Sequence, residues 1–517
     1  MSIESQRIRK LIDGVMASVD TLNKEFDVLY PPEPTQMGIY VNAGANLQHA
    51  YDQLFTTGGI ITLAPGMHTP LVLGERPLGA RLITITSDSA NLPEDGERIT
   101  PEFAEALGII RATAPTTSPI LCKNKSRNVA LVNVGIAPPE TKSYVHVYMG
   151  GDQNSMKLPE DRPTGFLFDR VYVYGDPVLG AHCGVVPNAR DVSIINSYFK
   201  DIFEIGRDSQ AVCSTNGGQN ILLENNYFEA GAENVMFGGS DSASPEMTSQ
   251  DIIIRDCEFS KNYEWMYLVK QPSIKALFEI KNVKRLLMER CLLQNNWARD
   301  WPTGVAITLK ACNGLRDEVW ATCEDVMLRD LVIRNVGSVF SQVGKNDSSR
   351  TSDWMRRVSI KNVLAYNINV DKWKGTGRFC PFINGCEGFY EMDHITVHTN
   401  QHSWMQMGFG QGITKSPGVL RLTNSIVAES EYGYISELNG VGFGAAAKDW
   451  TGIDISGNVF KAGVRGQGPV LANNLRLTPE AWDVSIGPDH KVIAGSPASQ
   501  VKTTDGKLPG ADIVGVF

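Results

Sequence analysis

Short segments of alternating apolar and polar residues recur along this chain, each around one small polar residue. Ten such segments can be aligned, from VALVNVGI (129–136) to RLTNSIV (421–427). The aligned polar column consists of Asn133, Asp169, Asn196, Asn225, Asp256, Arg290, Asp330, Asn362, Asp393 and Asn424. The steps between column residues vary from 27 to 40 residues. Strands that return with a turn residue at irregular intervals predict a solenoid of stacked rungs.

Asn and Asp suit the corner of such a rung because they tolerate left-handed backbone angles and bond locally to the main chain. Neighbouring rungs pair as parallel strands about 4.8 Å apart, so equivalent polar side chains can form a ladder. A sandwich or an α/β domain is disfavoured because the sequence lacks crossover helices and two-residue hairpin turns. Leucine-rich repeats need a shorter and steadier period. The pattern therefore predicts an all-β, single-stranded parallel β-helix.

The N-terminal segment has a different, heptad pattern of apolar residues. The two seam positions are occupied by Ile8, Val15, Leu22 and Leu29, and by Ile12, Val19 and Phe26. β-Branched residues at both positions favour a trimer, so residues 5–29 are expected to form a homotrimeric coiled coil. Pro31 and Pro32 end the helix. The alternative is an amphipathic helix docked on its own domain.

Four regions are expected along the chain. Residues 1–32 form the coiled-coil or docking segment, and 33–125 form a cap and the first rungs. Residues 126–461 form the β-helix body, and 462–517 a C-terminal capping segment. Within the cap, NLQHAYDQLF (46–55) reads as a short helix with Asn46 as its N-cap, because the apolar end of a solenoid needs a cover.

Composition narrows the class of protein. A net charge of −9 with 20% charged residues argues against nucleic acid as the main partner. The N-terminus shows no apolar run of signal-peptide type, and no stretch has the length of a membrane span, so the chain is expected to fold in the cytoplasm, where it is synthesised. The nine cysteines are scattered, and Cys257 and Cys291 occupy one column position, where a reduced, buried stack is expected.

Candidate chemistry lies where a second set of short strands recurs. These strands are QAVCS (210–214), NVMFG (234–238), FEIKN (278–282) and ITLKA (307–311). If they stack in this register, their polar residues gather on one lateral face of the coil.

Asp208, Glu233 and Glu279 are the predicted catalytic carboxylates, because stacked carboxylates shift one another's pKa and can act as acid and base. The predicted substrate-binding residues are Glu204, Gln210, Asn234, Lys281, Lys310, Trp265 and Trp297. The two Trp side chains are included because indole rings in loops can bind sugar faces. The alternative is a structural Glu/Lys ladder without catalysis.

No metal or cofactor is predicted. His394, His398 and His402 are four residues apart, but this stretch contains a predicted strand, on which that spacing does not gather three ligands. Acids near Asp241 and Asp251 lack the glycine-rich repeat of a calcium-binding solenoid.

Four stretches resemble a family of bacterial right-handed parallel β-helix repeat proteins of the pectate-lyase-like superfamily. They are RDSQAV (207–212), GAENVMFGGSD (231–241), LFEIKNVKRLLMERCLLQNNW (277–297), and GSPA followed by TTDGKLPGADI, and the resemblance covers residues 38–517. It implies a right-handed coil. It leaves function open, since the superfamily holds lyases, hydrolases, epimerases and binding proteins.

A leaderless heptad segment in front of a β-helix resembles a bacteriophage tailspike or tail fibre. We therefore expect a virion protein that recognises a bacterial surface polysaccharide, with degradation of that polysaccharide left open. Other virion proteins are expected to bind its N-terminus. The alternatives are a structural or adhesive fibre without catalysis, and a free bacterial glycoside hydrolase or polysaccharide lyase.

Overall fold

The computed structural model describes residues 37–114, 117–139, 143–300, 304–313, 318–345, 352–399, 403–409, 413–428, 431–462 and 470–513. The chain divides into two compact units, residues 1–273 and 274–517, and each is considered by itself. The predicted coiled coil over 5–29 lies outside the described residues.

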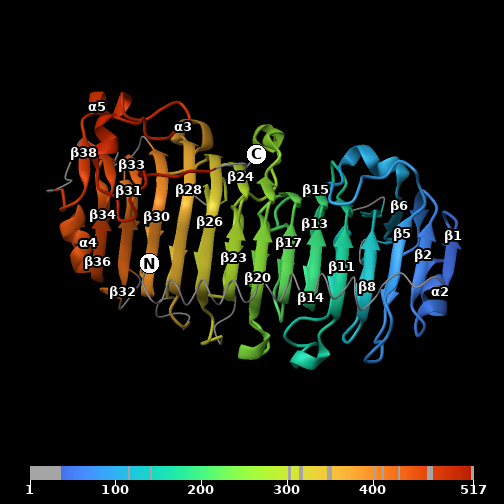
Figure 1. Cartoon of the computed structure of the whole chain (residues 1–517). Helices are drawn as coiled ribbons and strands as arrows, with labels where there is room; N and C mark the ends of the chain where they lie inside the picture. The colour runs from blue at the N-terminus through green and yellow to red at the C-terminus, as the bar shows by residue number, and fades with distance from the viewer. Residues whose placement is uncertain are drawn as a thin grey trace. The chain divides into compact units, whose positions relative to one another are not determined.

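In the first unit each full rung contributes three short strands. One strand precedes and one follows a one-residue corner, and the third strand belongs to a second sheet. Strand β14 (Arg190–Ile195), for example, pairs in parallel with β17 (Gln219–Glu224), with Val192 opposite Ile221. Figure 1 shows β14 and β17 side by side, both in shades of green. The elements of this unit are β1 (Gly38–Val41), α2 (Leu47–Leu54), β2 (Gly59–Leu63), β3 (Gly66–His68), β4 (Leu71–Leu73), β5 (Ile83–Ser87), η1 (Pro101–Ala106), β6 (Gly108–Arg111), β7 (Ile120–Cys122), β8 (Arg127–Val132), β9 (Val134–Ala137), β10 (Ser143–Met149), η2 (Pro159–Asp161), β11 (Thr164–Asp169), β12 (Tyr172–Tyr174), β13 (Ala181–Pro187), β14, β15 (Tyr198–Ile202), β16 (Gln210–Ser214), β17, β18 (Tyr227–Ala230), β19 (Glu233–Phe237), η3 (Pro245–Met247), β20 (Ser249–Arg255), β21 (Glu258–Ser260) and η4 (Tyr263–Tyr267).

The second sheet of this unit consists of β4, β7, β10, β13, β16 and β19, each paired in parallel with the next. The remaining paired strands, on either side of the corner residue, form the corner sheet. Aromatic side chains stack inside the coil from rung to rung, as in Phe199, Phe228 and Phe259, whose neighbouring ring centroids are 5.1 and 5.3 Å apart. Such stacking repeats because parallel rungs place equivalent residues above one another.

The predicted cap is present. Asn46 is the N-cap of α2, and its side chain accepts a hydrogen bond from the backbone N–H of His49 at 3.3 Å. The helix packs its apolar side, including the fully buried Leu47 and Tyr51, against the first strands. The buried guanidinium of Arg76 donates to the carbonyl oxygens of Phe55, Arg81, Arg127 and Asn128, which ties the end of the cap to the first rungs.

The predicted polar column forms the corner of the rungs. Eight of its ten residues have φ between 49° and 56°, in the left-handed region. The alignment was wrong by one residue at two rungs, where Arg170 and His394 take the corner in place of Asp169 and Asp393. The displaced carboxylates still join the ladder, because Asn196 donates to Asp169 and Asn424 donates to Asp393, both at 2.9 Å.

The second unit continues the same plan with longer strands. Its elements are β22 (Ala276–Ile280), β23 (Val283–Glu289), β24 (Leu292–Asn296), β25 (Val305–Lys310), β26 (Cys323–Val336), β27 (Ser338–Val343), β28 (Arg356–Ile368), α3 (Val370–Trp373), β29 (Cys380–Ile383), β30 (Glu387–Thr399), β31 (Ser403–Met407), β32 (Ser416–Thr423), β33 (Ile426–Ala428), β34 (Gly433–Ser436), β35 (Gly440–Val441), α4 (Phe443–Asp449), β36 (Trp450–Ser456), β37 (Val459–Lys461), β38 (Leu475–Leu477), α5 (Pro479–Asp483) and η5 (Pro497–Gln500). Strands β22, β25, β27, β29, β31 and β34 form its second sheet. Within this unit Arg290 lies at a corner and pairs with the buried Glu289 at 2.8 Å.

The C-terminal segment adds one more parallel strand, β38, which pairs with β37. Behind it Leu477, Trp482 and Val492 close an apolar cluster over the last rung. The chain then returns along the column. The N–H groups of Thr504 and Asp512 both donate at 2.7 Å, to the side-chain oxygens of Asn424 and Asn362 respectively.

All nine cysteines are buried and carry free thiols. Cys257 and Cys291 are both fully enclosed, as expected for small apolar groups. Among the described residues, no helix is long and apolar enough to cross a membrane.

Candidate functional site

The strands expected to carry the site do pair within each unit. In the first unit β16 pairs with β19, and in the second β22 pairs with β25. The predicted register between β16 and β19 was wrong by one residue, since Gln210 lies opposite Glu233 rather than Asn234. Asn234 therefore turns inward, where its amide donates to the carbonyl oxygens of Phe228 and Ser260 at 2.6 Å each.

An aromatic and charged cluster lies at the beginning of the second-sheet strands in the first unit. Strands β10 and β13 pair so that Tyr144 and His182 lie opposite each other, and their rings stack with centroids 4.6 Å apart. The guanidinium carbon of Arg207 lies 5.0 Å from the centroid of the Tyr144 ring, and Arg207 Nη2 donates to the Tyr144 hydroxyl at 3.4 Å. Half of the Tyr144 side chain is exposed. We call Tyr144, His182, Glu204, Arg207 and Asp208 the His182 cluster.

The carboxylates of this cluster come from the loop before β16. Glu204 Oε2 lies 3.1 Å from His182 Nδ1, and the Glu204 side chain is buried. The pKa of His182 is lowered, mainly by burial and also by the positive charge of Arg207, while the negative charge of Glu204 and a hydrogen bond to the Asp208 backbone oppose this shift. The Asp208 side chain is partly exposed and accepts a hydrogen bond from the Ser273 hydroxyl at 3.1 Å. The loop thus presents one enclosed and one accessible carboxylate.

Glu233 lies deeper than the sequence suggested. Its side chain is 1% exposed and accepts a hydrogen bond from Gln210 Nε2 at 2.7 Å. Near it the buried ammonium of Lys261 donates to the carbonyl oxygens of Ala230, Gly231 and Ala232 and to Asn234 Oδ1.

Burial lowers the pKa of Lys261, and the negative charge of Glu233 opposes that shift. The hydrogen bonds of Lys261 hold the turn between β18 and β19, and Glu233 is the first residue of β19. Glu233 and Lys261 are therefore placed to shape the strand beside the His182 cluster.

The remaining predicted residues have mixed positions. In the second unit Glu279 pairs with Lys281 at 3.6 Å, and Lys310 at the end of β25 is partly buried. Trp265 and Trp297 were expected to present indole faces to a sugar. They are 4% and 2% exposed, and Trp265 packs against Phe203. Both are core residues because the loops that carry them fold inward.

The sequence prediction named Glu204 and Asp208 as candidates and did not name Tyr144, His182 or Arg207, which lie in the same cluster. The signal was present, because SYVHVYM and AHCGVVP are the strands that precede QAVCS on the same sheet. Extending the strand alignment backwards by two rungs would have placed Tyr144 and His182 beside the loop at 204–209.

The His182 cluster combines an aromatic ring, an imidazole, a guanidinium and two carboxylates. Arg207 offers a planar set of donors to a carboxylate. Asp208 is a partly exposed carboxylate that accepts a hydrogen bond from Ser273, and the Glu204–His182 pair fixes the imidazole nearby. Within the residues that the structure describes, no three His, Cys, Asp or Glu side chains gather as metal ligands. His394 bonds instead to Asp505 and to the carbonyl oxygen of Gly510.

Comparison with known proteins finds no matching family model and no matching curated protein. Solved structures that the chain resembles include an alginate lyase from Paenibacillus sp. str. FPU-7, with 9% identity, a TM-score of 0.36, and coverage of 72% of this chain and 94% of that one. Another is the Dettilon tailspike protein, with 10% identity, a TM-score of 0.40, and coverage of 86% and 69%. A third is the family 28 exopolygalacturonase of Yersinia enterocolitica, with 11% identity, a TM-score of 0.33, and coverage of 86% and 78%. The strand pairing within each unit identifies the chain as a parallel β-helix protein, the fold predicted from its sequence.

Proposed function

We propose that this chain binds a bacterial surface polysaccharide containing acidic sugars, and that it does so at the His182 cluster. The observation that carries the proposal is the exposed Arg207 stacked on Tyr144, beside the accessible carboxylate of Asp208. Arg207 binds the carboxylate of an acidic sugar through paired hydrogen bonds. The exposed edge of Tyr144 covers the apolar side of the sugar ring. The exposed Ile205, which lies on the same loop as Arg207, covers it as well.

We further propose that the bound polysaccharide is cleaved there. Asp208 acts as the acid or base that contacts the glycosidic bond, since it is the accessible carboxylate of the cluster. Glu204 holds His182 and is a positioning residue. Glu233 supports the neighbouring strand through Gln210. Glu279, in the second unit, remains a proposed catalytic carboxylate.

The test is incubation of the full chain with a panel of acidic and neutral capsular polysaccharides and lipopolysaccharides. Cleavage is measured as new reducing ends or as the ultraviolet absorbance of unsaturated sugars. Asp208→Asn should lower the rate by about 100-fold or more, and Arg207→Met should weaken binding by about tenfold or more. Arg190→Met changes an exposed arginine on the corner sheet and should leave both unchanged. Full activity in Asp208→Asn would refute the proposed catalysis.

Adhesion without cleavage is a second candidate function. It is favoured by the burial of Glu233, which removes one of the predicted carboxylates from contact with substrate. Retention on an acidic polysaccharide column without released product, lost in Arg207→Met, would support this function over the enzymatic one.

We also propose that the chain belongs to a virion as a homotrimeric spike, attached through its N-terminal segment to other virion proteins. This proposal rests on the heptad pattern of residues 5–29. Light scattering should give the mass of a trimer for the full chain and of a monomer after removal of residues 1–32. A monomer in both cases would contradict it.

A further inference from the structure

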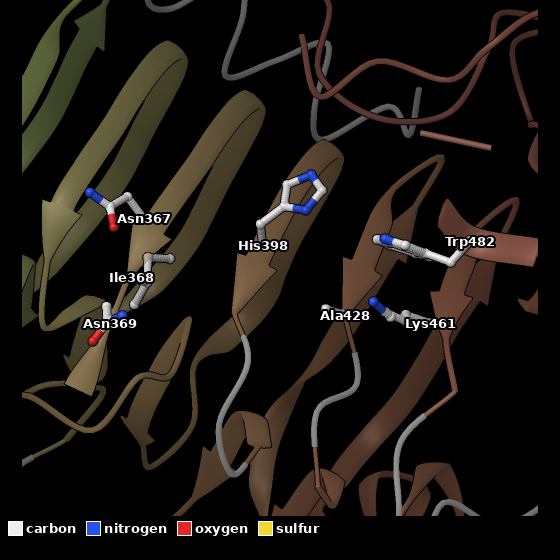
Figure 2. A pocket seen from close by; sticks show the side chains of 7 residues that line it. All are labelled: Asn367, Ile368, Asn369, His398, Ala428, Lys461 and Trp482. Atoms are coloured by element: carbon white, nitrogen blue, oxygen red, sulfur yellow. The ribbon is translucent and has the colours of Figure 1, made fainter. Parts of the chain in front are cut away.

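A small cavity of about 290 Å³ lies within the second unit, at the ends of strands β28, β30 and β37. Figure 2 shows its lining. The indole of Trp482 extends from α5 toward His398 and lies beside the ammonium of Lys461, while Asn367, Ile368 and Asn369 line the opposite side. The cavity is near the lower limit of pockets for small molecules, so it suits a ligand of about one sugar ring.

Several polar groups of the lining have hydrogen-bonding capacity to spare. Asn369 uses its side-chain oxygen as the N-cap of α3, accepting from Lys372 N–H at 3.0 Å. Asn367 uses its amide to donate to Asn335 at 2.5 Å. Among the described residues nothing pairs with the amide of Asn369, the side-chain oxygen of Asn367 or the buried Nε2 of His398. Of these groups the Nε2 of His398 is buried, whereas Asn367 is exposed and Asn369 is partly exposed. A buried polar atom without a partner is costly, and a ligand hydroxyl in the cavity would satisfy the His398 nitrogen.

Lys461 is the charged residue among those that line this cavity. The ammonium of Lys461 lies 5.8 Å from the Trp482 ring centroid and 3.7 Å from Asp483, whose side chain is 72% exposed. An ion pair with so exposed a carboxylate is weak, so Lys461 can exchange it for a bound anion. Burial lowers the pKa of His398 to about 4, and the charges of His490 and Lys461 act in the same direction. His398 is therefore a neutral imidazole at pH 7, able to bond a hydroxyl group.

We propose that this cavity binds a single acidic sugar of the hexuronate class. The carboxylate of the sugar pairs with Lys461 and the amide of Asn369, and its hydroxyls bond Asn367 and His398. The ring lies against Ile368 and the indole of Trp482. The donors and the positive charge favour a carboxylate over a neutral ligand, and the apolar walls favour a sugar over a bare anion. This site lies wholly in the second unit and does not depend on the function proposed for the His182 cluster.

Calorimetric titration of the full chain with glucuronate, glucose and sulfate tests the site. Glucuronate should bind with a Kd of roughly 1 mM, as small ligands of this size do, with glucose and sulfate each at least about tenfold weaker. Lys461→Met should weaken glucuronate binding by about tenfold or more, and Lys461→Arg should keep most of it. His398→Phe removes the ring nitrogen that bonds a hydroxyl of the sugar and should weaken glucuronate binding by about tenfold or more.

Two variants serve as controls. Lys448→Met, at an exposed lysine of α4, should bind glucuronate as the unaltered chain does. Arg207→Met should also bind glucuronate normally, which separates this site from the proposed polysaccharide site. Unchanged binding in Lys461→Met would overturn the proposal. So would sulfate or glucose binding as tightly as glucuronate, because the cavity would then not select an acidic sugar.

Discussion

The ladder of corner residues is expected to stabilise the coil, and substitution of Asn196 measures its contribution to the free energy of unfolding. Its φ is 51°, a left-handed angle. Its amide donates to Asp169 Oδ1 at 2.9 Å, and its side-chain oxygen accepts from Asn225 Nδ2 at 2.9 Å. Replacing Asn196 by alanine removes both bonds and places a β-carbon residue without a polar side chain at the left-handed angle. Replacing Asn196 by glycine also removes both bonds, but glycine adopts the left-handed angle without steric strain.

The two substitutions should therefore differ in size. The bond to the charged Asp169 contributes about 1.5–3 kcal/mol and the neutral bond about 0.5–1.5 kcal/mol. Alanine at a left-handed angle adds about 1–2 kcal/mol, whereas glycine adds about 0.5–1 kcal/mol through greater freedom of the unfolded chain. We expect Asn196→Ala to lower the free energy of unfolding by about 4 kcal/mol and Asn196→Gly by about 3 kcal/mol.

Equilibrium unfolding in urea, followed by fluorescence and shown to be reversible, measures these losses. The control is Asn91→Ala, since Asn91 is exposed and does not have a left-handed angle, and this change should cost under about 0.5 kcal/mol. Equal losses in Asn196→Ala and Asn91→Ala would show that the corner ladder does not stabilise the coil. A larger loss for glycine than for alanine would refute the role of the left-handed angle.

Three further substitutions probe buried charges. Burial raises the pKa of Glu229 to about 7, so the folded chain holds a proton that the unfolded chain releases near pH 4.5. Stability should fall as pH rises from about 4.5 to about 7, and Glu229→Gln should remove about 3 kcal/mol of that fall in urea titrations at several pH values. Arg76→Met leaves the carbonyl oxygens that bind the guanidinium without a donor and should cost about 3–5 kcal/mol, again measured in urea. The buried carboxylate of Glu289 pairs with Arg290 at 2.8 Å and with Arg329 at 2.5 Å. Glu289→Gln breaks both ion pairs and should also lower the free energy of unfolding by about 3–5 kcal/mol. A loss below about 1 kcal/mol in Arg76→Met or Glu289→Gln would contradict the expectation for that substitution.

The fold could be predicted because one corner residue per rung is chemically restricted. Asn and Asp dominate that position, so the column is visible in the sequence. A second corner lies five residues earlier, at Asn128, Asp191, Asn220 and Asp251 in the first unit, all with left-handed angles. The sequence does not show this second corner clearly, because residues other than Asn and Asp also occupy it. These are Gly165 in the first unit, and Arg285 and Arg357 in the second.

The site was harder to predict because it depends on register. A one-residue shift between β16 and β19 turned Asn234 into the interior, since successive strand residues face opposite sides. Loop direction was also invisible, so Trp265 was expected at the surface and lies in the core. By contrast Asp208 is accessible, because it lies in the loop before its strand.

Hydrogen exchange of the full chain with and without an acidic capsular polysaccharide tests the central claim most directly. If the His182 cluster binds the polysaccharide, peptides covering 143–149 and 204–210 should exchange more slowly in its presence, and Arg207→Met should abolish that protection while Arg190→Met preserves it. Protection confined to other parts of the chain, or protection that persists in Arg207→Met, would contradict the assignment of the site.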